Sequence, residues 1–144
     1  MHRRQLLIRS AAAAAACAAP AVLRAAAPAK VREFYAPDGS MSDWALTNEG
    51  KRVTVEGFMA PPLKANSTFF VQTKMPMSVC PFCETEAEWP DDIVAVYTRR
   101  IYDVVPFNRK IVTTGVIELG PYRDPDTRFL SMVRIAEASV QRIR

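Results

Sequence analysis

The clearest structural signal in this chain is the run Lys51-Arg52-Val53-Thr54-Val55-Glu56-Gly57-Phe58-Met59. Polar and apolar residues alternate along it, which is the period-two pattern of a β-strand with one buried face. Gly57 interrupts the side-chain pattern and indicates a bulge or bend, and Pro61 and Pro62 end the strand. A strand that bends at a glycine is typical of a small, strongly curved sheet.

Four further strand-like runs follow the first. The run 93–97 is apolar throughout and predicts a strand buried on both faces, while 110–119 again carries an internal glycine, Gly115. The last run is preceded by the turn-forming segment Gly120 to Asp126. Five short strands, two of them kinked at glycine, predict a mainly β domain built as a five-stranded OB-like barrel. The four later strands are expected at 68–73, 93–97, 110–119 and 129–138.

The residues before the first strand predict one short helix. It starts at Ser42-Asp43-Trp44-Ala45-Leu46, with Ser42 or Asp43 as its cap and with Trp44 and Leu46 facing the core. Residues 30–41 have little periodicity and contain the turn signal Pro37-Asp38-Gly39. We therefore expect a tether over 30–41 and a single folded domain over 42–144, with one or two short helices.

The first 29 residues have the composition of an export signal. The pair Arg3-Arg4 is followed by apolar residues, a long alanine run and the small-residue segment Ala27-Pro28-Ala29. A basic start, an apolar middle and a small-residue end are typical of a secretory signal peptide, and the paired arginines make it resemble a twin-arginine signal. We therefore expect cleavage after Ala29 and a periplasmic protein.

Neither a membrane span nor a lipid anchor is expected. The apolar middle of the signal is weakly hydrophobic and is interrupted by Pro20 and Arg24, whereas a spanning helix needs about 20 strongly apolar residues. Cys17 follows three alanines, and the large aliphatic residue that lipoprotein signals carry three places before the cysteine is missing. The mature chain is therefore predicted to have no transmembrane helix.

Removal of the signal changes the charge balance. Four of the 19 Lys and Arg residues lie within it and none of the 15 Asp and Glu residues does, which leaves 15 charges of each sign. A neutral chain gives no electrostatic reason to expect nucleic acid as a partner. His2 is the chain's one histidine and leaves with the signal, so no imidazole remains for metal binding or for a Ser-His-Asp set.

The candidate functional segment lies between the second and third predicted strands. Met75, Met77, Cys80 and Cys83 place two thioethers and two thiols within nine positions. Five acidic residues follow: Glu84, Glu86, Glu88, Asp91 and Asp92. In an oxidising compartment the two cysteines can form a disulfide that rigidifies the loop, and its small ring puts the stabilisation at the low end of about 2–4 kcal/mol.

The same four sulfur-containing residues also match a soft-metal site. Thiolate and thioether ligands select Cu(I), with Cys80, Cys83, Met75 and Met77 as the candidate ligands. A structural zinc site needs four Cys or His ligands, and the expected mature chain has two Cys and no His. Cu(I) therefore fits this segment better than Zn(II).

Thiol–disulfide exchange is the third interpretation. Cys80-Pro81-Phe82-Cys83 resembles the dithiol of glutaredoxins, with Cys80 as the attacking thiol and Cys83 as the resolving one. Such a dithiol normally lies at a helix N-terminus in a βαβ fold, whereas here it follows a strand and precedes carboxylates that raise the pKa of a thiol. We therefore expect a binding role, with a thiol–disulfide oxidoreductase as the alternative.

Two of the strands also carry a resemblance to a known family. Val53-Thr54-Val55-Glu56-Gly57-Phe58-Met59-Ala60-Pro61 and Thr113-Thr114-Gly115-Val116-Ile117-Glu118-Leu119-Gly120 resemble strands of an uncharacterised family, a domain of unknown function, of exported and often lipidated bacterial proteins with an OB-like fold. The likeness covers about residues 44–138. The chain departs from it at Cys80 and Cys83, where the family often has one cysteine near prolines, and at Arg128, where a turn glycine is expected.

The family resemblance bears on function as well as on fold. Some members are linked to metal-transport operons, and no reaction is defined for them. The resemblance therefore implies an accessory or binding protein whose partner is an export-side metal-transport or membrane complex.

Overall fold

The computed structural model describes residues 26–79 and 89–143. Most of the predicted signal peptide, with His2 and Cys17, lies outside these residues. The described elements are β1 (Ala29–Lys30), a 3-10 helix η1 (Val31–Phe34), α1 (Asp43–Asn48), β2 (Arg52–Met59), β3 (Phe69–Thr73), β4 (Ile93–Thr98), β5 (Lys110–Arg123) and β6 (Leu130–Arg142). No helix among the described residues is long and apolar enough to span a bilayer.

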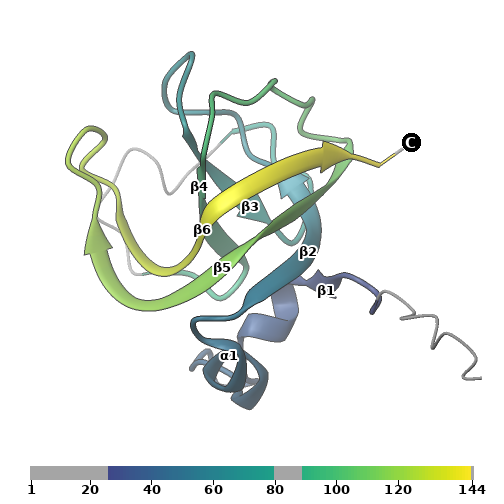
Figure 1. Ribbon diagram of the computed structural model, residues 1–144, viewed down its shortest axis with the longest axis vertical. Helices are drawn as coiled ribbons and strands as arrows, with labels where there is room; N and C mark the ends of the chain where they lie inside the picture. Colours follow the sequence, from purple (N-terminus) through teal and green to yellow (C-terminus); the bar gives the residue numbers. More distant parts are fainter. Residues whose placement is uncertain (1–25, 80–88, 144) are drawn as a thin grey trace, which may run out of the picture.

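Five of the strands form a closed ring. Neighbouring strands follow the order β2, β3, β4, β6 and β5, and β5 pairs back with β2 (Figure 1). The β4–β6 pair is parallel and the other pairs of the ring are antiparallel, while β1 adds a short parallel pairing to β2. The prediction of a mainly β, five-stranded barrel with very few helices is therefore confirmed.

The barrel interior follows from the alternation along its strands. On β2 the inward positions include Val55 and Met59, and on β5 they include Ile111 and Ile117, all of them fully buried. They pack in one core with residues of the other strands and of η1, among them Val31, Phe34, Phe70, Val94, Val96, Val133 and Ile135. The period-two pattern of the sequence is thus the pattern of the core.

A bulge in β6 changes which residues face inward. Val133 and Ile135 are buried before it, and Ala138 is buried after it, so the buried positions switch from odd to even numbers. The β5–β6 register shifts between Thr114 and Val116, and the extra residue Glu137 adopts a left-handed backbone with φ 48°. One inserted residue lets both halves of this long strand keep apolar side chains against the core.

A second apolar cluster covers the outer face of β3 and β4. Phe129, from the β5–β6 connection, packs on Phe69 with 5.3 Å between ring centroids and on Trp89 with 5.9 Å. The cluster also contains Ala60, Val71, Ile93 and Ala95. The strand predicted to be buried on both faces, 93–97, is buried on both over 93–96, because this cluster covers its outer side, and Tyr97 is half-buried.

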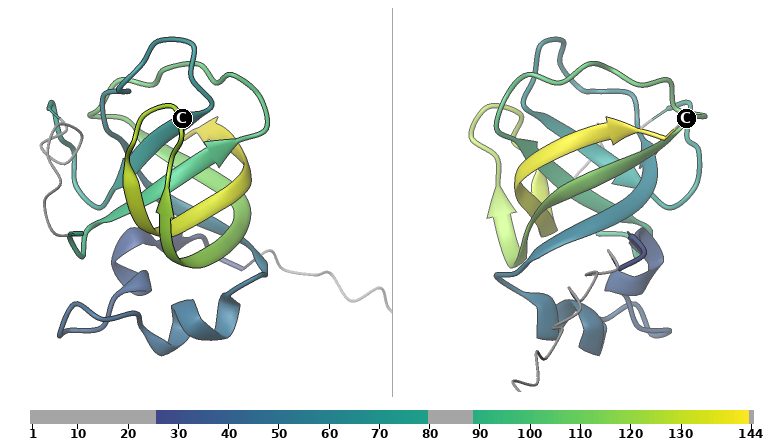
Figure 2. Two further views of the ribbon diagram at one scale, coloured as in Figure 1. Left: turned by 90° about the vertical axis from the view of Figure 1, so that its left-hand side faces the viewer. Right: turned by 45° about the vertical axis from the view of Figure 1, so that its right-hand side comes forward.

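The segment 30–41 differs from the predicted tether. Val31 and Phe34 are fully buried in the barrel core, and the Phe34 ring meets Trp44 edge-on at 5.1 Å. Figure 2 shows η1 and α1 together beneath one end of the barrel. The segment closes that end of the core, so the domain includes these residues.

Helix α1 begins where the sequence predicts. Ser42 is its cap, and the Ser42 Oγ accepts a hydrogen bond from the Ala45 N–H at 3.1 Å. The prediction that Leu46 faces the core is wrong, because its side chain is 54% exposed and Ala45 is the fully buried residue. A helix of six residues has fewer than two turns and therefore a narrow buried face, which Ala45 and the half-buried Trp44 form.

Strands β5 and β6 run beyond their predicted ends. The segment Gly120 to Asp126, expected as a turn, begins inside β5, because Gly120 and Pro121 lie at a second register shift between Leu119 and Tyr122. Proline is tolerated in a strand at such an irregularity. The turn itself starts at Asp124, whose Oδ1 accepts hydrogen bonds from the N–H groups of Asp126 and Thr127 at 2.9 and 2.7 Å.

Candidate functional site: the loop between β3 and β4

The residues predicted to carry the chemistry lie on the connection from β3 to β4. Cys80 and Cys83 fall outside the described residues. Met75 is described and its side chain is 60% exposed, while Met77 is half-buried. Met75 therefore belongs to no hydrophobic core, which removes core packing as the reason for a methionine at this position.

The start of this loop is held at the edge of the barrel. The last β3–β4 register pair is Thr73 with Ile93. One residue further, the Lys74 N–H donates to the Asp92 carbonyl at 2.9 Å, and the Thr73 hydroxyl donates to the Met75 carbonyl at 2.6 Å. The backbone that carries Met75 is therefore fixed within two residues of the sheet.

The end of the loop is held by a contact that is distant in sequence. The Trp89 indole N–H donates to the Tyr35 hydroxyl at 2.8 Å, and the Tyr35 hydroxyl donates to the Ile93 carbonyl. Burial raises the pKa of Tyr35 well above its usual range; the Trp89 hydrogen bond opposes this, and the Asp92 and Asp91 carboxylates add to it. The phenol therefore keeps its proton and remains a donor.

Acidic groups lie where the loop rejoins β4. Burial raises the pKa of Asp92, the neighbouring Asp91 carboxylate raises it further, and Lys74 on the opposite side of the loop base lowers it. One carboxylate oxygen of Asp92, Oδ1, is buried and has no hydrogen-bond partner among the described residues. Two adjacent carboxyl groups with one lysine beside them leave this end of the loop acidic, which favours a cation over an anion.

The described part of the chain holds no ready-made metal cluster. Within residues 26–79 and 89–143, no group of three or more His, Cys, Asp or Glu side chains is placed to hold a metal ion. The sulfur ligands predicted from the sequence are not tested by this finding, because Cys80 and Cys83 lie outside the described residues. Sequence reasoning missed the Tyr35–Trp89 link, which joins residues 54 positions apart.

Removal of the Tyr35 hydroxyl should loosen the loop base. Tyr35→Phe leaves the Ile93 carbonyl and the Trp89 N–H without their partner, so we expect the free energy of unfolding to fall by about 1–3 kcal/mol. Urea unfolding followed by circular dichroism measures it. Tyr122→Phe is the matched control, because Tyr122 is 41% exposed and should change stability by less than about 0.5 kcal/mol. Equal effects of the two variants would contradict a specific role of Tyr35.

Comparison with known proteins adds a structural likeness. No protein-family model matches the chain, and no curated protein matches it. Among solved structures, the crystal structure of a DUF3299 family protein from Pseudomonas aeruginosa PAO1 is similar to it, with 15% sequence identity and a TM-score of 0.49. The match covers 76% of this chain and 70% of that one.

Proposed function

We propose that this chain is an exported accessory protein of the periplasm that binds a soft metal ion, Cu(I), on the Met75–Cys83 loop. The thiolates of Cys80 and Cys83 are the principal ligands, and the thioethers of Met75 and Met77 complete the set. The observation that carries the proposal is the exposure of Met75, 60%, on a loop whose two ends are fixed to the barrel.

An exposed methionine at a fixed position is unusual for packing and useful for binding. A thioether in solvent contributes no core burial, while a flexible, polarisable sulfur is a good ligand for Cu(I). The acidic residues at the loop base, Asp91 and Asp92, add a local field that attracts a cation. Zinc fits less well, because two thiolates without histidine fall short of a tetrahedral site.

Export and partner choice belong to the same proposal. The signal-like segment 1–29 supports export to the periplasm, and the family resemblance suggests an export-side metal-transport or membrane complex as the partner that gives or takes the metal. In the oxidised protein the same two cysteines would form a loop disulfide. Metal binding therefore requires the reduced pair.

The barrel is inferred to be of the OB-like type. Support comes from its ring of five strands and from the parallel pairing of β4 with β6 inside an otherwise antiparallel barrel. OB barrels that bind oligonucleotides use the outer face of their second and third strands. In this chain that face corresponds to β3 and β4, and Phe129 and Trp89 pack over it, so nucleic acid is not part of the proposal.

Titration of the reduced protein with Cu(I) tests the proposal. Under anaerobic conditions, with bicinchoninate as the competing chelator, we expect one equivalent of Cu(I) to be held. Cys80→Ser combined with Cys83→Ser should abolish the binding, and Met75→Leu should weaken it by at least about tenfold. Met132→Leu, on β6 and outside the Met75–Cys83 loop, is the matched control and should leave the affinity unchanged.

Two results would overturn the proposal. Unchanged stoichiometry in the double serine variant would exclude the two thiols as ligands. Reduction of insulin by micromolar protein, with loss of that activity in Cys80→Ser, would assign the pair to thiol–disulfide exchange instead. A disulfide that mild reductants do not open would likewise assign Cys80 and Cys83 to a structural role.

A further inference from the structure

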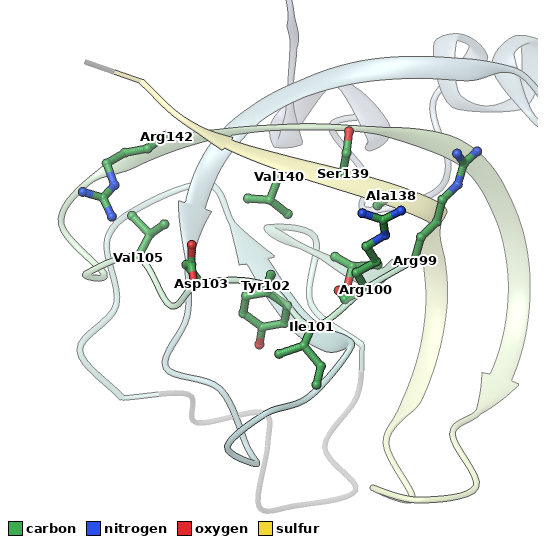
Figure 3. A pocket seen from close by; sticks show the side chains of 11 residues that line it. Arg99, Arg100, Ile101, Tyr102, Asp103, Val105, Ala138, Ser139, Val140 and Arg142 are labelled. Carbon is green, nitrogen blue, oxygen red and sulfur yellow. Dashed lines mark hydrogen bonds between the residues drawn. The ribbon is translucent and has the colours of Figure 1, made fainter.

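A cavity of about 510 Å³ lies at the opposite end of the barrel from η1 and α1. One wall is formed by residues 98–105, which lead from β4 towards β5, and the other by residues 138–142 of β6. Figure 3 shows Arg142 at one end of the cavity, Arg99 and Arg100 at the other, and Val140 and Tyr102 between them. None of these residues belongs to the loop of the proposed metal site.

The cavity lies where β4 and β6 stop pairing and diverge. Their last register pair is Thr98 with Ala138, directly after the left-handed Glu137, and β6 then continues to Arg142 with β5 on one side. The Arg99 N–H still donates to the Ala138 carbonyl, while the segment after it turns away. The final residues of β6 therefore have an edge that faces the cavity instead of a strand.

This edge presents backbone hydrogen-bonding groups. In an antiparallel pair, alternate residues direct their N–H and C=O groups towards and away from the partner strand. Ile143 bonds back to Lys110 on the β5 side, and Ala138 bonds to Arg99 on the other side. Val140 and Arg142 therefore direct their backbone groups to the cavity. In the described chain no backbone partner meets them there, and unpaired edges of this kind are templates for an added strand.

The cavity lining carries three arginines and one carboxylate, Asp103, around an apolar middle. The Arg99 guanidinium is held by Glu137 at 3.3 Å. No ion pair joins Arg100 or Arg142 to another described residue, and both side chains are exposed. Ile101 lies between them along the wall and is 62% exposed. Arg100 and Arg142 outnumber the single carboxylate of the lining, Asp103, so the open edge keeps a net positive charge with apolar side chains between the arginines. This pattern matches an extended chain that carries acidic residues.

We infer that this edge binds an extended acidic peptide segment of a partner protein, which adds as a strand beside Val140–Arg142. Such β-strand addition draws affinity from main-chain hydrogen bonds and specificity from side chains along the edge. A free small anion would use the arginines and leave the apolar wall and the backbone acceptors unmatched. A second copy of this chain, paired edge to edge, would bring its own Arg100 and Arg142 into the same basic site.

Fluorescence anisotropy with a labelled seven-residue peptide of alternating Glu and Val tests the charge requirement. We expect binding to the full chain, and a loss of affinity of about tenfold or more in Arg100→Glu combined with Arg142→Glu. The matched control is Arg32→Glu combined with Lys51→Glu, which changes the net charge equally from exposed positions near η1 and α1. Its affinity should stay within about twofold of the unaltered protein. No binding, or equal losses in both variants, would overturn the inference.

Backbone methylation separates strand addition from simple charge attraction. Two versions of the peptide carry N-methyl groups on alternate residues, one on the odd and one on the even positions, with all charges kept. Because only one edge of an added strand faces β6, one version should lose binding and the other should retain it. Equal binding of both versions would overturn the inference, as would a dimer in sedimentation velocity at the assay concentration, which would assign the edge to a second copy.

Discussion

Phe34→Ala should lower the free energy of unfolding by about 3–5 kcal/mol. The Phe34 side chain is fully buried and lies in the barrel core with Val31 and residues of β2, β5 and β6. Truncation removes its transfer free energy and leaves a cavity between η1 and the barrel. The loss is a large share of the roughly 5–15 kcal/mol that stabilises an ordinary domain. Urea unfolding followed by circular dichroism measures it.

Leu46→Ala is the matched control for Phe34→Ala. Leu46 lies in α1 at the same end of the barrel and is 54% exposed, so its truncation should change stability by less than about 0.5 kcal/mol. If Phe34→Ala fails to fold, Phe34→Leu keeps most of the volume and should show a smaller loss in the same direction. Equal stability of the alanine variants would mean that residues 30–41 are the tether that the sequence predicts.

The difference between prediction and structure in this segment has a physical cause. A 3-10 turn of four residues is too short to establish a hydrophobic period, and its buried residues, Val31 and Phe34, stand three apart in a segment without other repeats. The β-strands are long enough for the period of two to be read, so all five barrel strands were predictable. The cap residue Ser42 predicts helix α1. The prediction that Leu46 faces the core is wrong, because so short a helix does not show whether Ala45 or Leu46 lies on its inner side.

The bulge in β6 is visible in the sequence as a change in the alternation of apolar residues. Val133 and Ile135 alternate on odd positions, and Ala138 and Val140 continue on even ones. A strand that keeps one buried face cannot change parity without an inserted residue. The switch between 135 and 138 therefore points to the bulge, and with it to the place where β6 separates from β4.

The geometry around the candidate loop could not be predicted from a single sequence. The predicted order of the strands places the methionines and cysteines between the second and third strands. Met75 and Met77, which the structure describes, lie on that connection. The hydrogen bond from Trp89 to Tyr35 connects the loop to the segment predicted as a tether. No local sequence pattern predicts this contact. The exposure of Met75 is likewise a tertiary property, since methionine is as common in cores as in ligand sets.

Gly115→Ala should lower the free energy of unfolding by about 1–3 kcal/mol, the cost of overpacking a tight site. Gly115 lies opposite the β6 bulge, and a Cβ there would stand 2.6 Å from the Ala136 carbonyl oxygen and 2.6 Å from Ile135 Cγ2. The oxygen belongs to backbone fixed by the β5–β6 pairing, so rotation of a side chain cannot relieve the contact. Gly39→Ala is the control for backbone strain alone, because Gly39 has φ +81° and open space around it. Thermal and urea unfolding should rank Gly115→Ala as more destabilised than Gly39→Ala. When Ile135 is also changed to alanine in both backgrounds, the difference in stability between the two variants should narrow, since that change removes one of the two contacts. A Gly115→Ala protein as stable as the unaltered chain would show that the two strands can separate at the bulge without cost.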